Sequence, residues 1–148
     1  MKSEVKIDDN RMQITRVFDA PRRLVFACWK DVEKVQQWWG CKDTTKVDCE
    51  MDFRVGGTFT FKMQITGAGE FSYTGQYDEI VEPEKIAYHG DFGGTVTRVK
   101  IEFIEQGEQT KVVLTQQGFP MQNLCEMVSQ GTTEAFDKLD QMLVRQAA

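Results

Sequence analysis

The spacing of apolar residues changes once along this chain, and that change constrains the fold more than any other feature. Between Met12 and Gln117 apolar and polar residues alternate, which is the period of strands with one buried face. After Pro120 the apolar residues recur at helical spacing, at Leu124, Val128, Ala135, Leu139 and Met142. A sheet and a helix that each have one apolar face can bury both faces together when the sheet wraps around the helix.

Turn residues divide the alternating region into seven candidate strands. Short connections between consecutive strands indicate an antiparallel sheet with one buried face. The expected strands are Met12–Phe18, Val47–Phe53, Thr58–Ile65, Glu70–Val81, Lys85–Gly90, Thr95–Glu105 and Thr110–Gln117. We therefore predict an α+β fold in which an antiparallel, curved sheet of six or seven strands grips a long C-terminal helix from about Gln122 to Arg145.

Two short helices are expected between Pro21 and Trp39, after the first strand. Proline suits a first helical turn because it has no N–H to leave unsatisfied, and Gly40 supplies a stop. The adjacent indoles of Trp38 and Trp39 carry too much apolar surface for a water-facing loop. We expect these helices to close one end of the sheet.

Composition and charge limit the class of protein. A chain of 148 residues with 41% hydrophobic residues predicts a single domain over 1–148. The net charge of -5, without any Lys/Arg cluster, disfavours nucleic acid as a partner. Without a signal-like or membrane-spanning apolar run, the expected location is the cytoplasm. No C-x-x-C pair occurs among Cys28, Cys41, Cys49 and Cys125, so we expect four reduced, mostly buried thiols.

Little in the chain predicts catalysis. His89 is the only histidine, and strand alternation places it opposite Ile86 and Tyr88, toward solvent or a neighbouring strand. No second histidine or cysteine spacing supports a metal site, and no G-x-S-x-G elbow occurs. We predict no catalytic residue, no metal and no cofactor.

Arg16 is the most unusual charged residue, because it shares a strand phase with Met12, Ile14 and Phe18. An arginine in an apolar row requires a partner or an exit to water. It either emerges at the mouth of the sheet, pairs with an internal carboxylate such as Glu79, or meets an anionic group of a ligand. The ligand role and the structural pair stay open.

The inward phases of strands and helix predict one cavity wall. Tyr73 and Tyr77 add hydroxyls to it that either orient a ligand or pack in the core. The predicted ligand-binding residues are Arg16, Trp38, Phe59, Phe61, Met63, Tyr73, Tyr77, Val99, Ile101, Leu124, Val128 and Thr132.

Five motifs carry a resemblance to a known family. They are Thr15–Pro21, Leu24–Phe26, Trp38–Gly40, Phe53–Gly57 and Gly75-x-Tyr77-x-Glu79-Ile80. In these the chain resembles bacterial stand-alone proteins similar to the C-terminal domain of the heat-shock-protein-90 ATPase activator. That family belongs to the SRPBCC, or START-like, helix-grip superfamily. The resemblance implies a helix-grip fold with an internal cavity for a small, mostly hydrophobic ligand.

Two positions depart from the pattern of that family. Many relatives carry proline where this chain has Cys41, and a Gly-Trp pair where it has Gly131-Thr132, so space is freed beside the last helix. The full-length activator has an N-terminal domain without a counterpart here. We therefore expect ligand binding, with a cyclase- or dehydratase-type enzyme and a chaperone-interacting module as alternatives.

Overall fold

The computed structural model describes residues 2–147 and has the expected helix-grip architecture, with eight strands in place of six or seven. The strands are β1 (Glu4–Asp8), β2 (Arg11–Phe18), β3 (Thr44–Met51), β4 (Thr58–Ile65), β5 (Gly69–Val81), β6 (Lys85–Phe92), β7 (Thr95–Gln106) and β8 (Gln109–Gln117). The helices are α1 (Arg22–Lys30), α2 (Val32–Trp38) and α3 (Gln122–Ala147).

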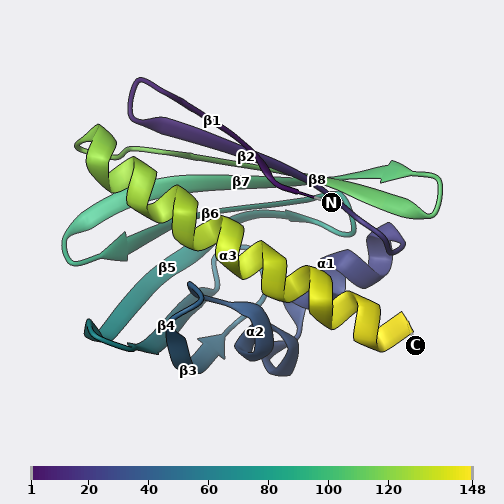
Figure 1. The fold of residues 1–148 in the computed structure, drawn as a ribbon, viewed down its shortest axis with the longest axis horizontal. Helices are drawn as coiled ribbons and strands as arrows, with labels where there is room; N and C mark the ends of the chain where they lie inside the picture. Colours follow the sequence, from purple (N-terminus) through teal and green to yellow (C-terminus); the bar gives the residue numbers. More distant parts are fainter. Residues whose placement is uncertain (1, 148) are drawn as a thin grey trace.

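All eight strands form one antiparallel sheet in the order β1-β2-β8-β7-β6-β5-β4-β3. Figure 1 shows α3 crossing the inner side of this curved sheet, with α1 and α2 at the end toward which α3 runs. The contacts of α3 go chiefly to β2, β1 and α2. Across residues 2–147, no helix has the length and apolar content needed to cross a membrane.

The additional strand is β1, which the sequence analysis did not predict. It pairs with β2 from Glu4↔Thr15 to Asp8↔Arg11 and forms one edge of the sheet. Only Ile7 of this strand is partly buried against the core, while its other side chains are exposed. The strand does alternate, with Val5 and Ile7 between charged residues, but two apolar residues in five positions are a weak signal.

The predicted strand Val47–Phe53 is shifted in the structure. β3 begins at Thr44 and ends at Met51, because the backbone turns from Asp52 onward. The N–H of Asp52 donates to Thr58 O, and the N–H of Gly57 donates to Arg54 O, so this turn leads directly into β4. Phe53 therefore lies on a turn and not in the sheet.

Aromatic side chains hold the helices against the sheet. The ring of Phe136 on α3 lies edge-on to Phe18 on β2, with centroids 5.6 Å apart. Trp29 on α1 contacts Phe103 on β7 at 5.1 Å and Trp38 on α2 at 4.7 Å. Such edge-to-face pairs stabilise a core beyond the area they bury. The inner face is thus covered by α3 over β2 and by α1 and α2 beside it.

Arg16 lies in the apolar row of β2 and is 4% exposed. Its guanidinium pairs with Asp137 on α3 and, at 3.3 Å from Nη2, with Oδ2 of Asp140. Glu79 is not its partner: the β5–β6 register shifts between Tyr77 and Glu79, and Glu79 pairs with Lys85 at 2.5 Å. The shift takes Glu79 out of the inward phase that strict alternation predicted. Arg16 therefore joins the sheet to the helix.

All four cysteines are free, as expected, and three are buried. Burial raises the pKa of Cys28 to about 11 and that of Cys49 to about 12, because the thiolate loses its hydration there. Burial also raises the pKa of Cys125. Cys41 is partly exposed, after α2.

The pair between Arg16 and α3 predicts an asymmetric response to mutation. Asp137→Asn with Asp140→Asn leaves a buried guanidinium without counter-charge and is expected to lower the free energy of unfolding by about 3 kcal/mol. Arg16→Met fills the site with apolar atoms and leaves two partly exposed carboxylates, so about 1 kcal/mol or less is expected. Urea denaturation measures both, with the exposed Glu108→Gln as control. Equal losses for the two variants would contradict this view of the pair.

The thiols are expected to differ in reactivity. At pH 8 a thiol of pKa about 11 is a thiolate in roughly one molecule per thousand, so Cys28 and Cys49 should not react in the folded protein. We expect one fast thiol per chain with a colorimetric disulfide reagent and four in urea. Cys41→Ser should remove the fast phase. Fast reaction of two or more thiols in the native protein would show that the core opens readily.

Candidate ligand-binding site

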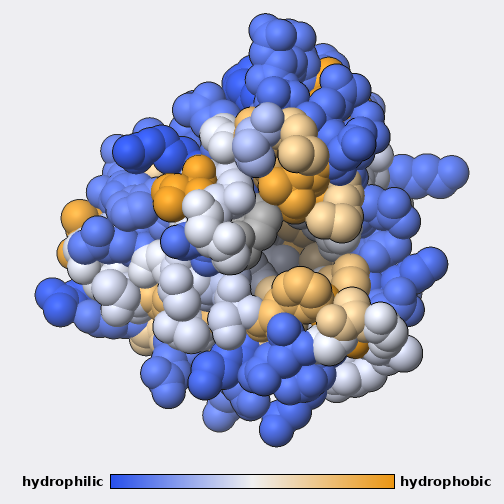
Figure 2. Space-filling model, turned by 90° about the vertical axis from the view of Figure 1, so that its left-hand side faces the viewer, coloured by the Kyte–Doolittle hydropathy of each residue, from blue (hydrophilic) through white to orange (hydrophobic). Residues whose placement is uncertain are grey.

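The face of the molecule at which α3 begins is hollowed. Figure 2 shows hydrophobic residues gathered on both sides of this hollow, while hydrophilic residues cover the surrounding surface. Leu124 and Val128, in the first turns of α3, are partly buried against the core. Met121 and Met127 of the same region are 56% and 65% exposed. Apolar surface is thus available beside the start of α3.

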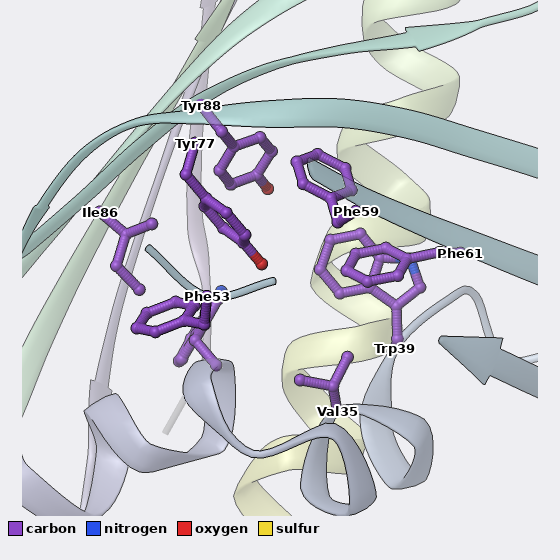
Figure 3. A pocket seen from close by; sticks show the side chains of 9 residues that line it. Val35, Trp39, Phe53, Phe59, Phe61, Tyr77, Ile86 and Tyr88 are labelled. Atoms are coloured by element: carbon purple, nitrogen blue, oxygen red, sulfur yellow. The ribbon is translucent and has the colours of Figure 1, made fainter. Parts of the chain in front are cut away.

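A cavity lies between strands β4 to β6 and the segments around α1 and α2 (Figure 3). Seven of its nine lining side chains are aromatic, and none of the nine carries a charge. The centre of a water-sized sphere can occupy about 10 Å³ of this cavity. The cavity therefore has room for about one water molecule. The lining residues are Trp29, Val35, Trp39, Phe53, Phe59, Phe61, Tyr77, Ile86 and Tyr88.

Three of the twelve predicted site residues, Phe59, Phe61 and Tyr77, line this cavity. Tyr73 is buried beside it and contacts the rings of Phe59 and Phe61. Other predicted residues lie outside the lining: Val99 and Ile101 are buried on β7, and Met63 is half-buried on β4, as are Leu124, Val128 and Thr132 on α3.

Arg16 and Trp38 have structural partners and do not line the cavity. Arg16 pairs with carboxylates of α3, as described above. The indole N–H of Trp38 donates to Cys28 O at 2.9 Å and ties α2 to α1 in the core. Of the two adjacent tryptophans, the cavity is lined by Trp39 and not by the predicted Trp38. Two adjacent residues at a helix end do not reveal which of them faces inward.

Six of the nine lining residues were not among the predicted site residues. Ile86 and Tyr88 share the inward phase of β6, so alternation carried a signal for both. Phe53 reaches the cavity from a turn and Trp39 from the residue after α2, where no period applies. The remaining two, Trp29 and Val35, belong to the predicted helices.

Close backbone approach makes room for the aromatic cluster. A Cβ at Gly90 would lie 2.2 Å from the ring of Tyr73, so this ring covers the backbone of β6 at a position where only glycine fits. After α2, Gly40 has φ +89°, and a Cβ there would lie 2.6 Å from Oγ1 of Thr44. That turn places Trp39 against Phe61, with ring centroids 4.4 Å apart.

The segment after α2 is fastened to α3. Nζ of Lys138 donates to Trp39 O at 3.1 Å and to Cys41 O at 3.2 Å. Burial lowers the pKa of Lys138 from its usual value. The ammonium therefore caps the carbonyl end of α2 and fixes the backbone that carries Trp39.

The three tyrosines differ in their hydrogen bonds. Tyr73 forms a side-chain hydrogen bond with Thr97, whose hydroxyl also accepts from Gln116 Nε2 at 2.9 Å. For Tyr77 and Tyr88, in contrast, no hydrogen-bonding side chain or backbone group is found within residues 2–147. Their hydroxyls point into the cavity in Figure 3. Burial raises the pKa of both phenols well above the usual value, so both stay protonated at physiological pH.

His89 lies away from the cavity. Its Nδ1 is 2.9 Å from the carboxylate of Asp78, and both side chains are partly exposed on the outer face of the sheet, as alternation predicted. Across the described residues, no three or more His, Cys, Asp or Glu side chains are grouped so as to hold a metal ion.

Solved structures share this fold over nearly the whole chain. Protein Ms6760 from Mycobacterium smegmatis has a TM-score of 0.85 and 19% identity, with 97% of this chain and 98% of that chain covered. The AHSA1 protein from Silicibacter pomeroyi has a TM-score of 0.82 and 18% identity, with 92% and 99% covered. A Rhizobium leguminosarum protein reaches 27% identity, with a TM-score of 0.75 and 97% of each chain covered.

No curated protein matches the chain significantly. The family model described as "Activator of Hsp90 ATPase homolog 1-like protein" matches residues 19–144, which include both short helices, six of the eight strands in whole and most of α3. The resemblance noted in the motifs is thereby confirmed, and the chain belongs to the Activator of Hsp90 ATPase homolog 1-like family.

Proposed function

We propose that this protein binds a small, mostly hydrophobic molecule in the cavity between β4–β6 and the α1–α2 segment. The observation that carries the proposal is the enclosed wall of seven aromatic and two aliphatic side chains without any charge. Each Å² of apolar ligand surface buried there contributes about 25 cal/mol. We propose that binding extends toward the predicted helix residues Leu124, Val128 and Thr132, in the N-terminal half of α3.

Binding requires the cavity to widen, since it has room for about one water molecule. Trp39 and Phe53 are the two lining residues that are only partly buried, and both lie on turns. Side chains on turns with one face toward solvent move at lower cost than those in the sheet. We propose that these two rings shift to admit the ligand.

The cavity lining lacks the side chains that acid–base catalysis uses. The cavity wall offers phenols but no carboxylate, imidazole or amine for proton transfer. A cyclase- or dehydratase-type activity therefore has no observation in its favour. The chaperone-interacting module remains an alternative that a pull-down from lysate tests. Four free cysteines support a reducing compartment, and we propose the cytoplasm.

Native mass spectrometry of freshly purified protein tests the proposal directly. We expect a mass adduct of a small organic molecule, or such an adduct after incubation with apolar compounds. Organic extraction should remove the adduct without unfolding the chain. Absence of any bound compound across an apolar library would contradict the proposed function.

Trp39→Ala is expected to enlarge the cavity. Removing this indole takes away one partly exposed side of the wall, so the neutral dye Nile red should bind about tenfold more tightly or faster. The free energy of unfolding should fall by about 2–3 kcal/mol, less than for a fully buried tryptophan. Fluorescence titration and urea denaturation measure the two effects. Ile104→Ala, which removes an exposed apolar side chain, is the control. Unchanged dye binding in Trp39→Ala would place the entrance elsewhere.

A further inference from the structure

Two tyrosines meet in the cavity from neighbouring strands. Tyr77 on β5 and Tyr88 on β6 are directly opposite each other in the antiparallel register. Their side chains are 5% and 6% exposed, and their hydroxyls point into the cavity in Figure 3. No group in the described part of the chain hydrogen-bonds either hydroxyl. Both hydroxyl oxygens keep some surface open to a water-sized molecule, so a ligand in the cavity can reach them. A phenol without a hydrogen bond in an apolar cavity is less favourable than one with a partner.

We propose that the cavity takes an uncharged aromatic carbonyl compound, whose carbonyl oxygen accepts hydrogen bonds from the hydroxyls of Tyr77 and Tyr88. This inference rests on the proposed function and names the ligand class of the same site. Tyr73, the third tyrosine of the chain, shows the contrasting arrangement, because its hydroxyl is engaged by Thr97.

A carbonyl oxygen suits a pair of donors. It has two lone pairs in one plane and can accept from both hydroxyls at once. Both phenols remain protonated far above neutral pH, so both are available as donors. Directly opposite residues of an antiparallel pair have Cβ atoms about 4.5–5.5 Å apart, which lets two side chains reach one group between them.

The absence of charge in the cavity wall disfavours an ionic ligand. A carboxylate in this cavity would lose its hydration without meeting a cation, because none of the nine lining residues is charged. Arg16, which the sequence offered as an anion-binding group, is already paired with Asp137 and Asp140. The ligand head is therefore polar and uncharged.

The shape of the wall favours a flat ligand. Neighbouring rings meet edge to face, as Phe53 and Tyr77 do at 5.1 Å and Phe59 and Tyr88 do at 5.2 Å. A planar aromatic body offers both faces and edges to such rings. An aliphatic body of equal size would bury similar area without these contacts.

Three matched probes test the ligand class: 2-acetylnaphthalene, its hydrocarbon analogue 2-isopropylnaphthalene, and the anion 2-naphthoate. Equilibrium dialysis gives the affinity of each for the wild type and for Tyr77→Phe, Tyr88→Phe and the double variant. We expect each single variant to weaken the ketone about fivefold to tenfold and to change the hydrocarbon less than twofold. The naphthoate should bind more weakly than the ketone.

Tyr73→Phe is the matched control and should leave the ratio of ketone to hydrocarbon affinity unchanged. Thermal melts establish that each variant is folded. The ketone affinity should also stay constant between pH 6 and 9, because neither phenol titrates there.

The outcomes separate this inference from the proposed function. If ketone and hydrocarbon bind but respond equally to the Tyr→Phe changes, or if naphthoate binds most tightly, the carbonyl inference is wrong and the apolar site stands. If none of the three probes binds to the wild type, the inference fails, and the proposed function fails with it when native mass spectrometry also finds no ligand.

Discussion

The inner face of the sheet carries more apolar surface than one helix can cover, and the remaining structure follows from that constraint. α3 lies chiefly along β2 and β1. α1 and α2 cover the neighbouring region through Trp29 and Trp38, and Trp29 contacts Phe103 of β7. The aromatic side chains of β4, β5 and β6 then face one another and the turn residues Trp39 and Phe53. A cavity results where rigid rings meet that cannot fill space as aliphatic chains do.

Arg16 fixes the side of the sheet on which α3 lies. Its charge is buried in the apolar row of β2, so it is stabilised only when Asp137 and Asp140 lie over it. The helix therefore cannot move toward β5 without leaving a guanidinium uncompensated. Because Arg16, the inward-pointing cation that the sequence analysis singled out, is held in this pair, it does not reach the aromatic cavity. The cavity wall therefore carries no charge.

The sequence predicted the fold better than the site. Periodicity located seven strands, the two short helices and α3, because each buries one regular face. β1 has only Ile7 against the core, and its short alternation of Val5 and Ile7 with charged residues was not recognised as a strand. The Tyr77–Glu79 register shift inverted the phase after it, so alternation assigned Glu79 to the wrong face. Local period cannot register such a shift, since it depends on the partner strand.

The site was harder to predict because side chains that point to the same face of the sheet do not all line the same cavity. Phe59, Phe61 and Tyr77 were found by alternation, but Val99 and Ile101 have the same inward phase and lie in the solid core. Trp39 and Phe53 enter from turns, where their direction is set by tertiary contacts such as that of Lys138 with the carbonyls after α2. Which rings leave space between them depends on distances across the sheet that a single strand does not encode.

Hydrogen bonding distinguishes the cavity from the rest of the interior. Several buried polar groups elsewhere have partners: Trp38 Nε1 with Cys28 O, Thr110 Oγ1 with Ala20 O, and Gln116 with Thr97. Within residues 2–147, Arg16 Nε is buried without a hydrogen-bond partner, but its guanidinium pairs with two carboxylates of α3. Phenylalanine at 77 and 88 would keep the same ring contacts without the two hydroxyls, for which the described residues supply no hydrogen bond. Polar groups to which the fold gives no hydrogen-bond partner concentrate at functional sites, because there the ligand supplies the partner. The hydroxyls of the two cavity tyrosines are such groups, and they lie where the fold leaves space between aromatic rings.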